Sequence, residues 1–353
     1  MGKCYINGIG SVSAQDNSSY DIFLENYSEL TESIVNVHKP EYKKHIKPTL
    51  IRRMANGVKN GVVASSIALK DAMIEKPQAI ITGTGMGCLV DSEKFLKNVI
   101  DNDEKFLTPT SFIQSTHNTV GGQIALGLNC QAYNVTYAHN STSFESSLID
   151  ALLMINDGET DILVGGIDEI GSYTASLFQL VNHIKKSDTL SQGILNSNSS
   201  GSIYSEGAQF FSLQNKITPN TYARLVDVEI YDTLNSETVT EKLVNYLNNN
   251  GLKTEDIDLV VLGKNGDKIY DKIYDDFCNS NFKNTQQIYY KHLCGEYHTA
   301  SAFGLWITGK ICKTQQIPNF LKLNNMKVTS IKNILLYNQY RGEGHSFTLV
   351  QSC

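Results

Sequence analysis

The chain has 353 residues, of which 41% are hydrophobic and 19% charged, and its formal net charge is −6. This composition is typical of a soluble globular protein, and a single core seldom extends beyond about 250 to 300 residues. We therefore expect one large domain or two fused halves. No run of Lys or Arg is longer than two residues, so the chain lacks the basic surface that nucleic acid or anionic lipid requires. We therefore expect neither nucleic acid nor a membrane as a partner.

The seven cysteines are scattered along the chain and include no CxxC pair. Their spacing predicts neither a disulfide framework nor a zinc site, and we expect no metal. Residues 1–13 lead directly into an apolar strand without a basic segment, and no apolar run reaches 18 residues. We therefore expect reduced thiols and a cytoplasmic location.

Short β-rich runs alternate with segments of helical periodicity along the first half of the chain. Strands are predicted at 3–10, 78–85, 132–138 and 161–166, and helices at 53–72, 121–127 and 143–156. This alternation predicts an α/β layered fold.

Four landmarks of the first half recur in the same order in the second half, which indicates a degenerate internal repeat. The corresponding segments are 67–87 and 244–266, 134–155 and 288–311, 161–169 and 333–344, and 207–214 and 345–351. The segment KITPN at 216–220 interrupts the pattern, so we predict an N-terminal half at 1–216 and a C-terminal half at 217–353. Two strand-turn-helix elbows, near Ser141 and near Glu296, are then expected to face one cleft.

Several stretches resemble the β-ketoacyl synthases of the thiolase fold. They are YINGIGSVS at 5–13, the Arg-Arg-Met helix at 51–72, GTGMG at 83–87 with 108–137, GETDILVGGIDE at 158–169, YSEGAQFFSL at 204–213 and NQYRGEGHSFTLV at 338–350. The resemblance covers nearly the whole chain and implies a duplicated αβαβα layered fold with two central mixed sheets. The GTGMG turn lacks the acidic partner of a dinucleotide-binding unit, so no bound cofactor is expected.

The resemblance implies a chemistry that needs a cysteine thiolate at a helix N-terminus and two histidines that drive decarboxylation of a malonyl carrier protein. A helix N-terminus stabilises a thiolate, but it cannot ionise a serine hydroxyl. Counting back from Asp161 places the nucleophile position at Ser141, with His139 and Asn140 as alternatives if the turn carries an insertion. Cys130 lies upstream of the strand, and we expect its side chain to be buried and to contribute only to packing.

Neither family histidine is found at its expected position. After the strand at 259–262 the chain has Gly263, Lys264 and Asn265. At the second position the family has a Gly-His pair after a lysine, whereas here Lys291 is followed by Gly295 and Glu296. Glu296 thus stands where the histidine is expected. His298 would take that position only if this chain carries a two-residue insertion in the segment GEYHTASA. A carboxylate facing a malonyl carboxylate at about 4 Å would cost roughly 4 kcal/mol at an effective dielectric of 20.

The same residues also have structural interpretations. Ser141, Ser143, Ser146 and Ser147 are small enough for close helix packing, with Ser141 as the helix cap. Lys291 and Glu296 are expected to form an internal ion pair. A serine mechanism would need a base near Ser141, for which Glu296 and His298 are the candidates.

The resemblance implies a member of the 3-oxoacyl carrier-protein synthase family without its Cys-His-His triad, and hence inactive alone. Within that family, the chain is most similar to the chain-length factors of aryl-polyene or flexirubin-type pathways. Such a subunit forms a heterodimer with an active ketosynthase and limits the length of the product. An acyl carrier protein would bring the phosphopantetheine, and whether the chain also forms a homodimer stays open. Two alternatives stay open: an active acyltransferase that uses Ser141 with Glu296 or His298, and a non-enzymatic scaffold that binds an acidic carrier through basic residues at 43–44 or 52–53.

Overall fold

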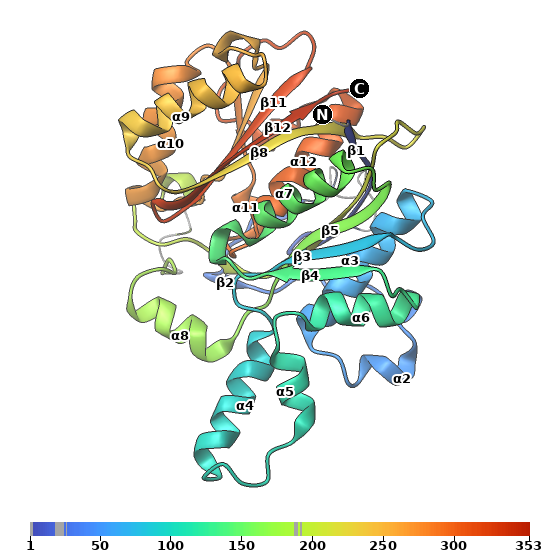
Figure 1. Ribbon diagram of the computed structural model, residues 1–353. Helices are drawn as coiled ribbons and strands as arrows, with labels where there is room; N and C mark the ends of the chain where they lie inside the picture. The colour runs from blue at the N-terminus through green and yellow to red at the C-terminus, as the bar shows by residue number, and fades with distance from the viewer. Residues whose placement is uncertain (1–2, 18–24, 26, 187–189, 191–192) are drawn as a thin grey trace.

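A computed structural model describes residues 3–17, 25, 27–186, 190 and 193–353 (Figure 1). Its main feature is a ten-stranded mixed sheet with the strand order β10-β9-β11-β12-β8-β1-β7-β5-β3-β4. The strands are β1 (Cys4–Val12), β3 (Ala79–Gly83), β4 (Tyr133–Tyr137), β5 (Asp161–Asp168), β7 (Gly207–Gln214), β8 (Ala223–Thr233), β9 (Leu259–Leu262), β10 (Gln286–Tyr289), β11 (Asn333–Tyr340) and β12 (Glu343–Gln351).

The predicted repeat is visible in how the strands pair. From β1 outward, β7 and β5 follow with antiparallel pairing and β3 and β4 with parallel pairing. From β8 outward, β12 and β11 likewise pair antiparallel, and β9 and β10 pair parallel. The sequence predicts two sheets, whereas here the two sets join edge to edge because Cys4–Ile6 of β1 pairs with residues 223–225 of β8.

Three hydrophobic clusters separate the helices into layers. One cluster packs α7 (Ser143–Asn156) and α12 (Ser301–Thr314) between strands of both halves. A second packs α3 (Asn56–Asp71) and α6 (Thr119–Leu128) on the outside of the first half. The third packs α9 (Ser236–Asn249) and α10 (Lys268–Asn281) on the second half. Figure 1 shows α7 and α12 in the middle of the molecule, as expected for a thiolase-like layered fold.

The sequence explains why α7 and α12 occupy the middle layer. Apolar residues of α7 recur at helical spacing at Phe144, Leu148, Ala151 and Ile155, and all four are buried. Helix α12 is buried along most of its length, including Phe303 and Trp306, as expected for core residues. A helix that is apolar all round is stable in water only when elements cover it on both sides.

A hairpin of two helices, α4 (Leu89–Asp101) and α5 (Pro109–Ser115), projects from the layered body (Figure 1). The shorter helices α2 (Pro48–Ile51), α8 (Ser172–Leu180) and α11 (Lys291–Cys294) lie in connections between the main elements. Over the described ranges, no helix combines the length and apolar character needed to cross a membrane. The same ranges contain no cluster of three or more His, Cys, Asp or Glu side chains suited to a metal ion.

Candidate functional site

The first elbow joins β4 to α7 through a short 3-10 turn, Asn140–Thr142. Asn140 has a φ of +49°, a left-handed conformation that Asn tolerates better than most residues. The hydroxyl of Ser143 holds the turn: it accepts a hydrogen bond from the His139 N–H at 2.8 Å, and it lies 2.7 Å from the Asn140 carbonyl and 2.9 Å from the Thr84 carbonyl. These contacts fix the elbow against the end of β3.

Ser141, at the predicted nucleophile position, is only 6% exposed. The expectation that it caps α7 is wrong, because the residue that precedes the helix is Thr142 and no side chain caps it. The backbone at Gly344 packs so closely here that a Cβ atom added to Gly344 would lie 2.4 Å from Ser141 Oγ. The side chain therefore faces the turn between β11 and β12.

The other residues considered for the first elbow have different surroundings from Ser141. His139 and Asn140 are exposed, and His139 Nδ1 lies 3.2 Å from Ser146 Oγ. Cys130 is buried before β4 and its thiol lies 3.4 Å from the Pro77 carbonyl, as expected for packing. Burial raises the pKa of Glu145, which accepts a hydrogen bond from Ser346 at 3.0 Å.

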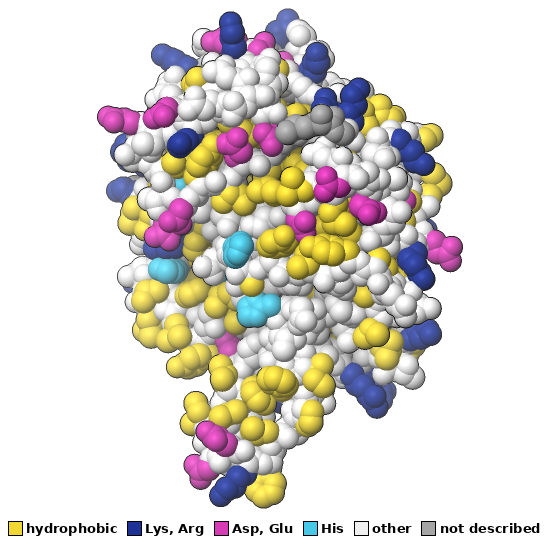
Figure 2. All heavy atoms as spheres, viewed as in Figure 1, with side chains coloured by type: hydrophobic (Ala, Val, Ile, Leu, Met, Phe, Trp, Pro, Cys, Tyr) yellow, Lys and Arg dark blue, Asp and Glu magenta, His cyan; other side chains and the backbone are white. Residues whose placement is uncertain are grey.

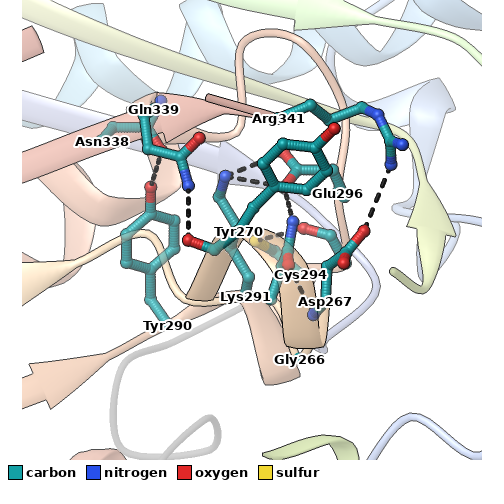
Figure 3. Close-up of polar contacts among 12 residues, drawn as sticks. Gly266, Asp267, Tyr270, Tyr290, Lys291, Cys294, Glu296, Asn338, Gln339 and Arg341 are labelled. Carbon is teal, nitrogen blue, oxygen red and sulfur yellow. Dashed lines mark hydrogen bonds and ion pairs between the residues drawn. The ribbon is translucent and has the colours of Figure 1, made fainter. Parts of the chain in front are cut away.

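The second elbow runs from β10 through α11 to Glu296, with Gly295 at a φ of +71°. The Glu296 carboxylate is buried, and its two oxygens lie 2.8 and 2.9 Å from the Lys291 ammonium (Figure 3). This pair confirms the predicted internal ion pair. The side-chain amide of Asn265 donates a further hydrogen bond to Glu296 at 2.5 Å.

The contact between Asn265 and Glu296 was not predicted from the sequence. Asn265 follows β9 and Glu296 follows the neighbouring parallel strand β10. Because the carboxyl ends of adjacent parallel strands meet at one edge of a sheet, the repeat itself contained the signal that could have placed the two side chains together.

Asp168, at the end of β5, is a second residue that sequence reasoning missed. Its Oδ1 accepts hydrogen bonds from the Gly85 N–H at 2.9 Å and from the Thr84 hydroxyl at 3.1 Å. Its Oδ2 accepts two more, both at 2.8 Å, from the N–H and hydroxyl of Thr299. Asp168 therefore fastens the turn after β3 to the second elbow.

The two elbows are not joined by a proton path in the part of the chain that the structure describes. No hydrogen bond links Ser141 Oγ there with Glu296, His298 or Lys291. His298 packs against Gly85 and stacks on Tyr340 with ring centroids 4.9 Å apart. Both Glu296 oxygens are occupied by Lys291 and Asn265, so this carboxylate has little capacity to accept a proton from a serine.

Comparison with known proteins shows where the same fold is found. The model of the β-ketoacyl synthase N-terminal domain matches residues 27–176. No curated protein sequence matches the chain. Among solved structures, a β-ketoacyl synthase from Burkholderia phymatum is 16% identical with a TM-score of 0.83, and each chain is covered to 100%.

Two further solved structures contain a ketosynthase with a chain length factor. The ishigamide ketosynthase/chain length factor is 16% identical with a TM-score of 0.80, covering 100% of this chain and 99% of the other. A ketosynthase in complex with its chain length factor from Xenorhabdus doucetiae is 14% identical with a TM-score of 0.77, covering 100% and 98%. The resemblance to the β-ketoacyl synthases is thus confirmed, by the sequence of residues 27–176 and by the fold of the whole chain.

Proposed function

We propose that this chain, which has the fold of the β-ketoacyl synthases, is a condensation-silent subunit that forms a heterodimer with an active ketosynthase, as chain length factors do. One observation carries the proposal: the second elbow, where the resemblance places a catalytic histidine, instead holds a buried polar network of Lys291, Glu296 and Asn265. By the same resemblance Ser141 takes the place of the family's cysteine, and Gly263, Lys264 and Asn265 stand where the other histidine is expected. A network that is fully satisfied within the protein supports a role in holding the fold.

The edge strand β4 offers a surface for the partner. Among the residues that the structure describes, it pairs only with β3 and ends the sheet, which leaves its outer backbone groups open to a strand of another chain. Exposed apolar side chains flank it: Leu126 on α6 is 73% exposed, Leu153 on α7 58% and Tyr133 on β4 47%. An open sheet edge bordered by apolar side chains is typical of a protein interface.

The projecting hairpin of α4 and α5 adds a second apolar surface. Figure 2 shows hydrophobic side chains spread over this hairpin. The most exposed of these residues are Leu96, Ile100, Phe106, Phe112 and Ile113. We assign this hairpin to contact with the partner ketosynthase, where it would limit the length of the product.

A basic corner supports binding of an acidic carrier protein, which would supply the phosphopantetheine. Residues 39–59 contain seven of the chain's 30 Lys and Arg but one of its 36 Asp and Glu. Five of these cations are exposed and form no ion pair with any residue that the structure describes: Lys39, Lys43, Lys47, Arg52 and Arg53. Figure 2 shows Lys and Arg gathered over α2.

The pairing is tested by co-expressing the chain with a ketosynthase encoded close to it and weighing the intact complex by native mass spectrometry. A one-to-one complex that condenses malonyl carrier protein only when both chains are present is expected. Leu153→Glu should abolish the complex, while Ile269→Glu, an exposed apolar residue of α10, should leave it intact. Turnover by this chain alone would instead favour an acyltransferase that uses Ser141.

Carrier binding has a separate test. Arg52→Glu with Arg53→Glu should weaken binding of the carrier at least about tenfold at low salt, and the effect should fade as salt screens the charges. Lys327→Glu with Lys332→Glu makes the same change in net charge and should have little effect. Equal losses for both double variants would indicate a response to net charge only.

A further inference from the structure

Residues 341–344, which form the turn between β11 and β12 and the first two residues of β12, cover the first elbow in an uncommon conformation. Arg341, Gly342 and Gly344 have φ values of +55°, +82° and +57°. Glycine adopts such values freely, but an arginine does so only when surrounding contacts hold it there. Since the backbone at Gly344 lies against Ser141 Oγ, whatever fixes this turn also controls access to Ser141.

The contacts that fix the turn begin with Arg341. Its guanidinium lies 3.2 Å from the Asp267 carboxylate and 4.8 Å above the centre of the Tyr270 ring (Figure 3). The Asp267 side chain is 2% exposed and accepts hydrogen bonds from the N–H groups of Gly201 at 2.9 Å and Ile269 at 3.0 Å. The carboxylate is therefore held rigidly at the start of α10, so it is an anchor for the arginine.

A second set of bonds holds the same turn closed. Gln339 Oε1 accepts a hydrogen bond from the Gly342 N–H at 2.7 Å, and the Gln339 N–H donates to the Tyr274 hydroxyl at 2.9 Å. His345 Nε2 lies 3.1 Å from the Gly342 carbonyl. The Gly342 N–H is thus occupied, so it is not free to stabilise an oxyanion beside Ser141.

We propose that Arg341, Asp267 and Tyr270 form a clamp that keeps the 341–344 turn closed over Ser141. A hydroxyl or thiol at position 141 is then shielded from an acyl thioester whatever its own reactivity. The proposed subunit would then lack condensation activity for two reasons: the family's catalytic triad is absent, and the clamp blocks access to position 141. The clamp rests on the geometry of the first elbow, and pairing with a ketosynthase would stand if the clamp failed its test.

The test measures access to position 141 with a maleimide reagent on the full chain carrying Ser141→Cys. The native Cys353 is exposed and reports the unhindered labelling rate in the same sample, while Cys88 is buried. Peptide mass spectrometry follows each site separately. The thiol introduced by Ser141→Cys is expected to react at least about tenfold more slowly than Cys353.

Adding Arg341→Gly should open the turn, because glycine keeps the left-handed backbone without strain and removes the guanidinium. We expect the thiol introduced by Ser141→Cys to react about tenfold faster, with Cys88 still protected, since a charged hydrogen bond has been lost. Lys272→Ala breaks an exposed ion pair with Asp276 on the same helix and should change nothing. An unchanged rate in the Arg341→Gly variant, or equal gains at position 141 and at Cys88, would overturn the clamp.

Discussion

The two elbows of the duplicated fold are built on the same strand-turn-helix plan but are stabilised by different interactions. At the first elbow the uncharged hydroxyl of Ser143 binds backbone groups of the turn and of the end of β3. At the second elbow a buried ammonium and a buried carboxylate, Lys291 and Glu296, are only 1% and 5% exposed. The difference teaches that the repeat conserves backbone geometry, while each half has found its own means of holding it.

The largest effect is expected from breaking the second elbow. Lys291→Met leaves the Glu296 carboxylate buried with only the Asn265 amide, and removing one partner of a buried pair typically costs about 3 to 5 kcal/mol. Urea unfolding at pH 7 measures this loss. The double change Lys291→Met with Glu296→Met should regain much of it, and equal losses in the single and double variants would show that the charge is not the cause.

The next largest effect is expected at His292: the unfolding free energy of the wild type should depend more strongly on pH than that of His292→Phe. Burial lowers the pKa of His292 to about 3 from its ordinary 6.5, and the ring stacks on Tyr289. Between these values the unfolded chain binds a proton that the folded chain does not. The stability due to this neutral histidine is therefore complete above pH 6.5 and is lost as the pH falls toward 3.

Unfolding by urea at pH 7 and pH 5 tests this prediction. Wild type should lose about 2 kcal/mol more than His292→Phe on this change, because phenylalanine keeps the stacking but cannot titrate. The comparison isolates His292 from Glu169, whose pKa burial raises to about 7 and which acts in the opposite direction. Parallel pH profiles for the two proteins would contradict the assignment.

At the first elbow, Ser143→Ala should destabilise the chain by about 1 to 2 kcal/mol, because the His139 N–H and the Thr84 carbonyl lose their shared partner. Ser147→Ala is a suitable control. Among the described residues its hydroxyl bonds only the Ser143 carbonyl within α7, so the loss should be smaller. Equal losses would mean that Ser143 does not hold the turn.

The smallest effect is expected at the apex of the first elbow. Ser141→Ala should change the unfolding free energy by less than about 0.5 kcal/mol, since the described residues offer its hydroxyl no hydrogen bond. In the heterodimer it should leave condensation unchanged. A fall in condensation without a fall in stability would assign chemistry to Ser141 and revive the acyltransferase alternative.

Much of the local structure followed from periodicity. The helix at 143–156 has the predicted limits, and the strands at 79–83 and 133–137 lie within their predicted ranges. The ion pair of Lys291 and Glu296 was predictable because the two residues are five apart on one elbow. Local patterns of this kind need no knowledge of how the layers pack.

Contacts between distant segments were not predictable in the same way. Arg341 and Asp267 are 74 residues apart, and neither lies in a pattern that distinguishes it from an exposed charge. Ser143 holds the first elbow although Ser141 has the more familiar position for a cap, since the extra 3-10 turn shifts the start of α7. The two sheets join through a short stretch of β1 that pairs with β8, and no local sequence pattern predicts this pairing.

Asp168 has a consequence for how the protein is made. Its two oxygens serve segments on either side of it, and Thr299 leaves the ribosome 131 residues later. Until then, the Oδ2 atom of Asp168 in the nascent first half lacks the two hydrogen bonds that Thr299 donates. We therefore expect the two halves to complete their folding together and not one after the other.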